Sequence, residues 1–272
     1  MRTVIGCPYA QKAFGYAAPI GALAGLIGLG GGEFRLPVLM HVIGFPAKAS
    51  VPLNLIVSLT TLAAALLFRS HVTPAGTLQQ HLPEMAGLLC GGVASAFWGT
   101  RLVQRLKDER LVAAIGVLLA GIGVLMLVEV AFPFEPLALS PDALPRFSLG
   151  IGLGVGIGFV SSLLGVAGGE LLIPSLMFIF GADIKTAGTA SLFISLVIVA
   201  VGIWRYGRMG AIPKGGGPRR IIAAMSLGSI IGGLIGGLAA AIAPVAALKI
   251  VLGVVLLAAA GKTLWSHRSA PN

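Results

Sequence analysis

Residues 28–37 read GLGGGEFRLP, and residues 165–174 read GVAGGELLIP. Both stretches place neighbouring glycines, a glutamate and a proline in the middle of a long apolar segment. Neighbouring glycines weaken a helix, and irregular backbone inside a bilayer is tolerated only where it is buried in protein or lines a polar cavity. The two stretches therefore predict a pair of interrupted membrane helices.

The composition of the whole chain is typical of a membrane protein. Of its 272 residues, 57% are hydrophobic and 10% are charged. A soluble domain carries about a quarter charged residues, so soluble enzymes are excluded. The net charge of +10 is spread over short basic clusters between apolar runs. This distribution is typical of cytoplasmic membrane loops and argues against nucleic acid as a partner.

Eight apolar runs fill the chain. The first and the fifth are too long for one straight span of about 20 residues, and each contains a glycine cluster, so each is predicted to form two half-helices. The prediction is an all-α polytopic membrane protein whose halves each have one broken pair of half-helices plus three full spans. The runs cover residues 14–44, 50–68, 84–100, 111–131, 147–181, 187–204, 219–242 and 246–264.

The two halves of the chain are related by an internal repeat. Residues 25–58 align without a gap with residues 162–195, at an offset of 137 positions, and 12 of 34 residues are identical. A proline-rich linker at 132–146 separates the first repeat, 1–131, from the second, 147–272. The repeats are expected to form one integral membrane domain, because such halves share one interface.

Basic residues predict how the repeats are oriented. Loop 101–110 contains four basic residues and its equivalent 238–247 none, whereas loop 205–220 contains five and its equivalent 68–83 only Arg69. Cytoplasmic loops are enriched in Lys and Arg, so equivalent loops are predicted to lie on opposite faces, as in an inverted repeat. That arrangement places fourteen basic residues on one face and four on the other. Both termini are then predicted to be cytoplasmic. The protein itself is predicted to lie in the inner (plasma) membrane.

Each glycine cluster is expected to start a half-helix, over residues 33–44 and 170–181. The N–H groups and the positive dipole end of such a helix favour an anion, and two breaks that meet near the midplane would form one site. Pro37 and Pro174 are expected near the first turn, where proline is best tolerated. The predicted substrate-binding residues are Gly30, Gly31, Gly32, Glu33, Arg35, Pro37, Asn54, Ser58, Gly168, Gly169, Glu170, Pro174, Ser191 and Ser195.

A simpler interpretation is that the glycines only allow helices to pack closely. It is preferred for the isolated Gly-x-x-x-Gly pairs. The duplicated clusters, each followed by Glu and Pro, favour a binding site, because irregular backbone in lipid is energetically unfavourable. The isolated pairs are Gly21/Gly25, Gly87/Gly91, Gly152/Gly156, Gly232/Gly236 and Gly233/Gly237.

Glu33 and Glu170 are candidates for proton coupling. A carboxylate at membrane depth is usually functional. The alternative is that each glutamate caps its half-helix or pairs with Arg35 or a lysine. Ionised carboxylates would repel an anion, which suggests that one or both carry a proton that moves with it, since burial favours the neutral acid.

Other polar residues give weaker evidence of a role in the predicted site. Arg35, whose counterpart is Leu172, either contacts the anion or snorkels to the interface. Hydroxyl and amide side chains further along each repeat either line the cavity or bond neighbouring helices. These are Asn54, Ser58, Thr60, Thr61, Thr189, Ser191 and Ser195. The four histidines and two cysteines share no metal spacing, and neither a metal nor a cofactor is expected.

The duplicated G-x-x-G-G-x-x-x-x-P element resembles the TauE/SafE sulfite exporter family of membrane permeases. Its copies run from Gly28 to Pro37 and from Gly165 to Pro174, with Ala167 in place of a second-copy glycine. The resemblance extends over essentially the whole chain. It implies a carrier that moves sulfite, organosulfonates or similar sulfur anions, usually outward.

The leading prediction is a secondary transporter that works by alternating access, with a small anion and the lipid bilayer as partners. An anion channel could use the same half-helices. An intramembrane enzyme is the third class, but the chain has no catalytic motif such as H-E-x-x-H. A homo-oligomer is compatible with the sequence.

Overall fold

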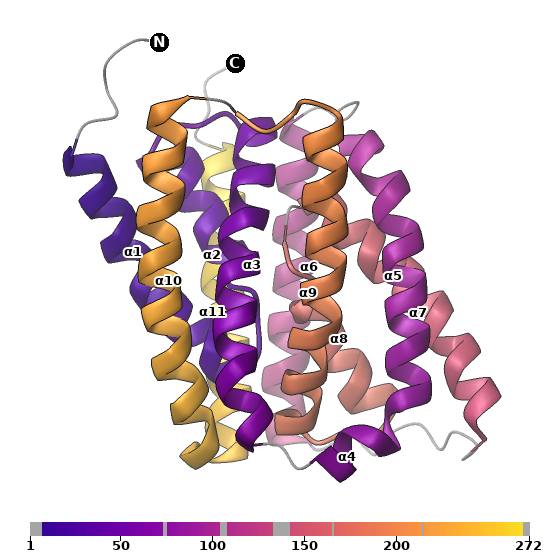
Figure 1. The fold of residues 1–272 in the computed structure, drawn as a ribbon. Coiled ribbons are helices and arrows are strands. Elements are labelled where there is room, and N and C mark those ends of the chain that lie inside the picture. Colours follow the sequence, from indigo (N-terminus) through magenta and orange to yellow (C-terminus); the bar gives the residue numbers. More distant parts are fainter. Residues whose placement is uncertain are drawn as a thin grey trace.

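The computed structural model describes residues 7–72, 75–103, 108–132, 142–164, 166–213 and 215–268. In these ranges the chain forms helices and connecting turns, with no strand (Figure 1). The first-half helices are α1 (Cys7–Ile27), α2 (Gly32–Pro37), η1 (Val38–Val42), α3 (Ala47–Val72), α4 (Ala75–Gln80), α5 (Leu82–Val103) and α6 (Asp108–Ala131). The second-half helices are α7 (Ala143–Leu164), α8 (Gly169–Pro174), η2 (Ser175–Ile179), α9 (Ile184–Arg208), α10 (Gly216–Ile242) and α11 (Val245–Arg268).

The chain is a multi-pass membrane protein. Within the described residues, four helical segments are long and apolar enough to cross a membrane. They are Lys48–Leu67, Ala143–Ser162, Ile184–Arg208 and Gly216–Ile242. The linker prediction falls largely on residues 133–141, which lie outside the described residues.

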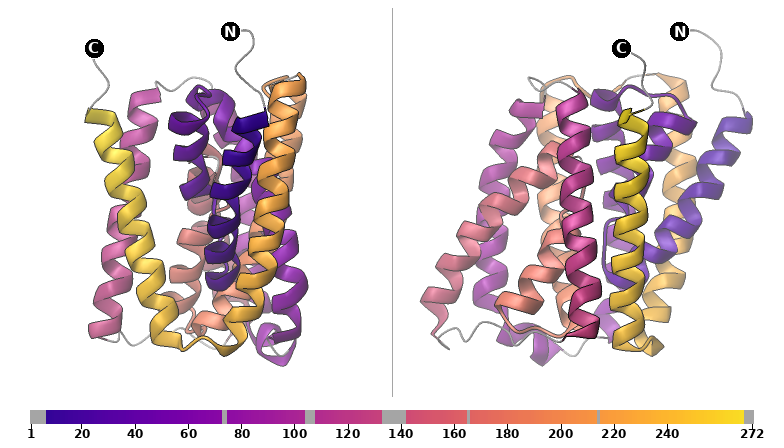
Figure 2. Two further views of the ribbon diagram at one scale, coloured as in Figure 1. Left: turned by 90° about the vertical axis from the view of Figure 1, so that its left-hand side faces the viewer. Right: turned by 180° about the vertical axis from the view of Figure 1, so that it is seen from behind.

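Equivalent helices of the two halves run in opposite directions (Figure 1). In Figure 1, α1 begins at the end of the bundle where α11 finishes, and α3 descends from that end while α9 ascends towards it. The side and back views of Figure 2 show the same arrangement. The helix bounds recur at the sequence offset of 137 residues, so that α2 corresponds to α8 and α6 to α11.

One predicted loop contains helix instead. Residues 68–72 complete α3, and Ala75–Gln80 form α4 at the end of the bundle opposite the start of α1 (Figure 1). Arg69, predicted to lie in this loop, is buried in the last turns of α3. A buried arginine needs acceptors, and Arg69 finds them in carbonyl oxygens near the end of α1 and at the start of α9.

The first helix of each half packs against a helix of the other half. α1 packs on α10, and α7 packs on α5. Glycines bring the backbones together: a Cβ atom on Gly21 would lie 2.6 Å from the carbonyl oxygen of Ser229, and one on Gly150 would lie 2.8 Å from that of Glu84. The prediction that Gly152 and Gly156 form such a contact is wrong, because both face open space.

Candidate functional site

The chain leaves the helix at both predicted glycine clusters. α1 ends at Ile27 and α2 starts at Gly32, and the intervening Gly28 and Gly31 have φ of 100° and 67°. In the second half Gly168, with φ of 83°, precedes α8. Side chains other than glycine rarely adopt these left-handed conformations. Gly165, part of the predicted second cluster, lies outside the described residues.

The two breaks are in direct contact. A Cβ atom on Gly32 would lie 3.3 Å from the Cα atom of Val166, and one on Gly169 would lie 3.3 Å from the Cα atom of Leu29. A Cβ atom on Gly30 would clash with the Cβ of Ala167. Residues 27–33 and 166–170 are all buried. In this conformation the two breaks are therefore closed off from solvent.

Side chains from neighbouring helices bond the carbonyl groups that the breaks expose. Asn54 Nδ2 donates to the carbonyl oxygen of Gly32 at 2.9 Å, and Ser191 Oγ donates to that of Gly28 at 2.7 Å. Ser161 Oγ donates to the carbonyl oxygen of Val166 at 2.5 Å. Asn54 and Ser191 are equivalent residues of α3 and α9, so each of these helices supplies one donor to the first break.

Arg35 is fully buried at the first break and does not snorkel to the interface. Its Nη1 donates to Thr61 Oγ1 at 2.6 Å and to Ser229 Oγ at 2.9 Å. Its Nη2 donates to Ser58 Oγ at 2.9 Å and to the carbonyl oxygen of Gly30. Neutral groups thus hold the guanidinium, and its positive charge is not cancelled by a bonded carboxylate.

Glu33 and Glu170 meet between the half-helices. They are 2% and 3% exposed, and their carboxyl groups are close enough to interact electrostatically. Both also interact electrostatically with Arg35. Gly31 and Gly168 occupy the N-cap positions, so neither glutamate is the N-cap residue of its half-helix. Both Glu33 oxygens and Glu170 Oε1 accept no hydrogen bond from a described residue.

Residues 149–272 match the family model described as Sulfite exporter TauE/SafE. The second half of the chain is therefore similar to the sulfite exporter TauE/SafE family. The TauE/SafE region begins in α7 and includes Gly168, Gly169, Glu170 and Pro174. No curated protein and no solved structure matches the chain.

Within the TauE/SafE region, Ser195 is fully buried and its Oγ has no hydrogen-bond partner among the described residues. Its equivalent in the first half is Ser58, which accepts a bond from Arg35. The second half has Leu172 at the position of Arg35. The positive charge of the site therefore comes from the first half, outside the TauE/SafE match.

The two prolines lie deeper in the half-helices than predicted. Pro37 and Pro174 are the last residues of α2 and α8, where the α-helix changes to the wider π-helix. Proline lacks the N–H that an α-helix would bond at that position, which favours a change of helix type. The half-helices end at Gly44 and Gly181, with φ of 84° and 73°. These glycines permit the left-handed turn that commonly ends a helix.

Two residues that the sequence analysis did not select bind the ends of the broken helices. Arg69 Nη1 donates to the carbonyl oxygen of Gly25 at 3.4 Å, near the end of α1. At equivalent positions in the TauE/SafE region, Tyr206 Oη donates to the carbonyl oxygen of Ser162 at 3.2 Å, near the end of α7. Ser229 was also missed, because its counterpart, Gly92, has no side chain that would have marked the position.

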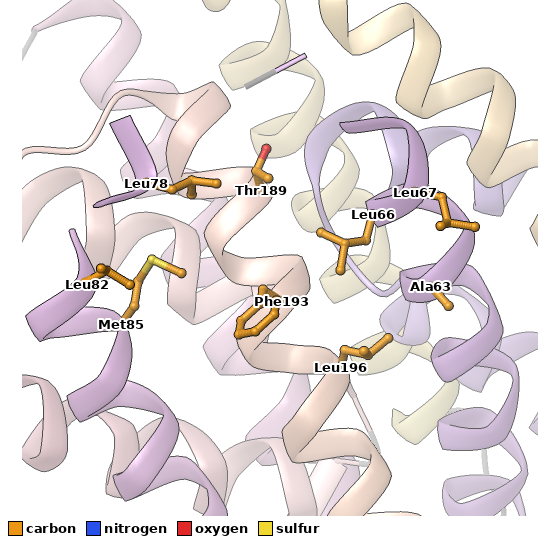
Figure 3. Close-up of a pocket in the computed structure, with 9 residues that line it drawn as sticks. All are labelled: Ala63, Leu66, Leu67, Leu78, Leu82, Met85, Thr189, Phe193 and Leu196. Carbon is orange, nitrogen blue, oxygen red and sulfur yellow. The ribbon is translucent and has the colours of Figure 1, made fainter. Parts of the chain in front are cut away.

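A cavity of about 650 Å³ lies between α3, α4, α5 and α9. Figure 3 shows its lining, which is apolar apart from Thr189. The Thr189 hydroxyl donates to the carbonyl oxygen of Lys185 on its own helix, as Thr60 does to that of Val57. These two bonds stay within one helix each, and the apolar walls of the cavity do not suit an anion.

Proposed function

We propose that the chain is a secondary transporter, an exporter, of small sulfur-containing anions such as sulfite or organosulfonates. The observation that carries the proposal is the contact between the two buried breaks beside the guanidinium of Arg35. The family match supports sulfite-type anions as substrates. In this proposal the anion binds where the breaks meet.

The chemistry of the breaks suits an oxyanion. Two helix starts point their N–H groups and positive dipole ends towards the meeting point. Arg35 adds a full positive charge in a region shielded from water. The proposed ligands are the N–H groups around Gly31, Gly32, Gly168 and Gly169, together with Arg35, Asn54, Ser58, Ser191 and Ser195. Because Asn54, Ser58 and Ser191 already bond other groups, binding requires the breaks to separate.

Glu33 and Glu170 are proposed to carry the coupled proton. With Arg35 they form a buried cluster that is neutral when it holds one proton and carries a net charge of +1 when it holds two. A buried net charge is unfavourable unless it is paired, so a second proton and a monovalent anion favour each other's binding. The cluster therefore supports transport of the anion together with a proton.

Alternating access is proposed to follow from inverted repeats, 1–131 and 147–272, around the shared site. The opposite directions of α3 and α9 support this architecture. The charge of the loops supports a cytoplasmic position for the end of the bundle where α1 begins, in the inner membrane. Movement of one half-helix pair against the rest would expose the site to one face at a time.

The proposal is tested by labelled-sulfite counterflow in proteoliposomes containing the purified chain. Saturable uptake that is accelerated by unlabelled sulfite on the opposite side is expected, since a carrier exchanges its substrate across the membrane. Uptake without saturation or counterflow would favour the channel. A panel of sulfite, sulfate, thiosulfate, sulfoacetate, taurine and carboxylates then defines the substrate class, and failure to move any of them would refute the proposal.

A further inference from the structure

Three ionisable side chains meet at the end of the bundle where α4 lies. Glu84, in the first turn of α5, is fully buried, and its Oε1 accepts a hydrogen bond from Arg146 Nη2 at 2.7 Å. The same oxygen lies 2.6 Å from His81 Nδ1. These contacts lie far from the breaks in sequence and are not used by the proposed anion site.

Arg146 also contacts the second half-helix. Its Nη2 donates to the carbonyl oxygen of Phe180 at 3.2 Å, and Phe180 directly follows η2. A cation at the C-terminal end of a helix is favourable because it complements the negative dipole end. One guanidinium therefore joins the beginnings of α5 and α7 to the end of the half-helix that starts at Gly169.

The half-helix α8–η2 has its main packing partner outside the α5–α7 pair, on α9, which itself also packs on α5. α5 and α7 pack backbone to backbone through glycines, so that a Cβ atom on Gly150 would lie 2.8 Å from the Glu84 carbonyl oxygen and 3.2 Å from the Gly87 Cα atom. The bond from Arg146 to Phe180 therefore connects a tightly packed helix pair to the half-helix.

The repeat places uncharged residues at the positions equivalent to this cluster. The positions equivalent to His81, Glu84 and Arg146 are Pro218, Ile221 and Tyr9. A buried ion pair gives little net stability compared with apolar residues of the same size. Its presence at only one of the two sets of equivalent positions therefore suggests a role other than stabilising the fold.

We propose that Glu84 is a positioning residue, which acts through Arg146 to hold the second half-helix closed, and that the Glu84–Arg146–Phe180 contact is the gate at this end of the bundle. The inference rests on the proposed alternating access. With the contact formed, the half-helix is held against α5 and α7. When Arg146 releases Phe180, the half-helix moves away from the beginnings of α5 and α7 and opens a path from this end to Glu170 and Gly168.

The test is the labelling rate of Met177→Cys in the second half-helix, in a chain carrying Cys7→Ser and Cys90→Ser. Met177 is 7% exposed, so a membrane-impermeant maleimide added at the α4 end should react slowly. Glu84→Gln is expected to raise the rate by at least about tenfold, because loss of one partner of a buried ion pair shifts an equilibrium by more than that factor. Met40→Cys, at the equivalent position of the first half-helix, is the matched control and should not respond.

The double variant Glu84→Gln/Arg146→Gln separates a gate from a purely structural contact. It leaves no unpaired buried charge and is expected to fold even where Glu84→Gln alone does not. A gate predicts that Met177→Cys stays rapidly labelled in the double variant. Labelling at the original rate, or a rise at Met40→Cys as well, would overturn the inference. The measurement uses no substrate, so it can succeed or fail independently of sulfite transport.

Discussion

The buried carboxyl group of Glu33 interacts electrostatically with the buried carboxyl group of Glu170, 137 residues further along the chain. Each glutamate is the second residue of its half-helix, directly after the glycine that begins it. Two ionised carboxylates that interact away from water repel each other strongly, which is why the pair is proposed to carry the coupled proton. This interaction links the two breaks chemically as well as spatially.

Substitution of Glu33 or Glu170 by Gln should remove the dependence of transport on a proton gradient. The amide keeps the size of the side chain but can no longer exchange a proton. The measurement is sulfite uptake into proteoliposomes with and without an imposed pH gradient, compared with gradient-free counterflow. Asp183→Asn, outside the site, is the control. Full proton dependence in both glutamate variants would contradict the coupling role.

Tyr206→Phe should lower the free energy of unfolding by about 1 kcal/mol, the usual contribution of one buried hydrogen bond. The variant loses the bond to the Ser162 carbonyl oxygen at the end of α7. Thermal unfolding of the purified protein in detergent measures the change. Tyr16→Phe is the matched control, because Tyr16 is 46% exposed on α1. Equal effects of the two substitutions would show that the Tyr206 bond does not stabilise the helix end.

Asp183 should make the start of α9 sensitive to acid. Its carboxylate accepts hydrogen bonds from the backbone N–H groups of Lys185 and Thr186, at 2.9 Å and 3.1 Å. Partial burial raises the pKa of Asp183, but hydrogen bonds from Thr186 and the backbone outweigh this effect and lower the pKa below its usual 3.8. The stabilisation is therefore present above the unfolded-state pKa and is lost as the pH falls through the lowered folded-state pKa.

Asp183→Ala should accordingly reduce stability at neutral pH by about 1 kcal/mol, as for other N-cap losses, whereas Asp183→Asn should retain most of the cap. Thermal unfolding between pH 7 and strongly acidic pH compares the three proteins. The difference between Asp183 and Ala should shrink on acidification. A difference that is constant with pH would contradict the carboxylate cap.

Gly150→Ala and Gly152→Ala should have opposite effects although they lie on the same helix. A Cβ atom on Gly150 would lie 2.8 Å from the carbonyl oxygen of Glu84, and one on Gly152 meets nothing within 4 Å. The first change should destabilise by about 1–3 kcal/mol through overpacking. The second should be neutral or stabilise by up to about 1 kcal/mol through helix propensity. Similar unfolding temperatures for both would contradict the packing of α5 on α7.

The helix breaks could be predicted from the sequence because their signals are local. Glycine clusters inside apolar segments interrupt a helix wherever they occur, and the segments themselves have spanning length. The relative placement of side chains could not be predicted in the same way. Arg69 and Glu84 find their partners 44 and 62 residues away, and no local pattern identifies those partners.

The glycines of α7 illustrate the same limit. Residues 150, 152, 154, 156 and 158 are all glycine, so spacing by four residues fits either of two faces of the helix. Packing on α5 selects Gly150, Gly154 and Gly158, and only the fold decides this. The change to π-helix after Pro37 and Pro174 has a local cause, the missing N–H group. It could not be predicted, because a proline in a helix is compatible with several backbone conformations.

The most direct test of the account is equilibrium binding of labelled sulfite to the purified protein with Arg35→Gln, using Arg205→Gln as a control that removes the same charge at the end of α9. Loss of a buried charge that contacts the anion should weaken binding by at least about tenfold, whereas the control should bind as the unaltered chain does. Equal sulfite affinity of Arg35→Gln and the unaltered chain would contradict an anion site at the paired breaks.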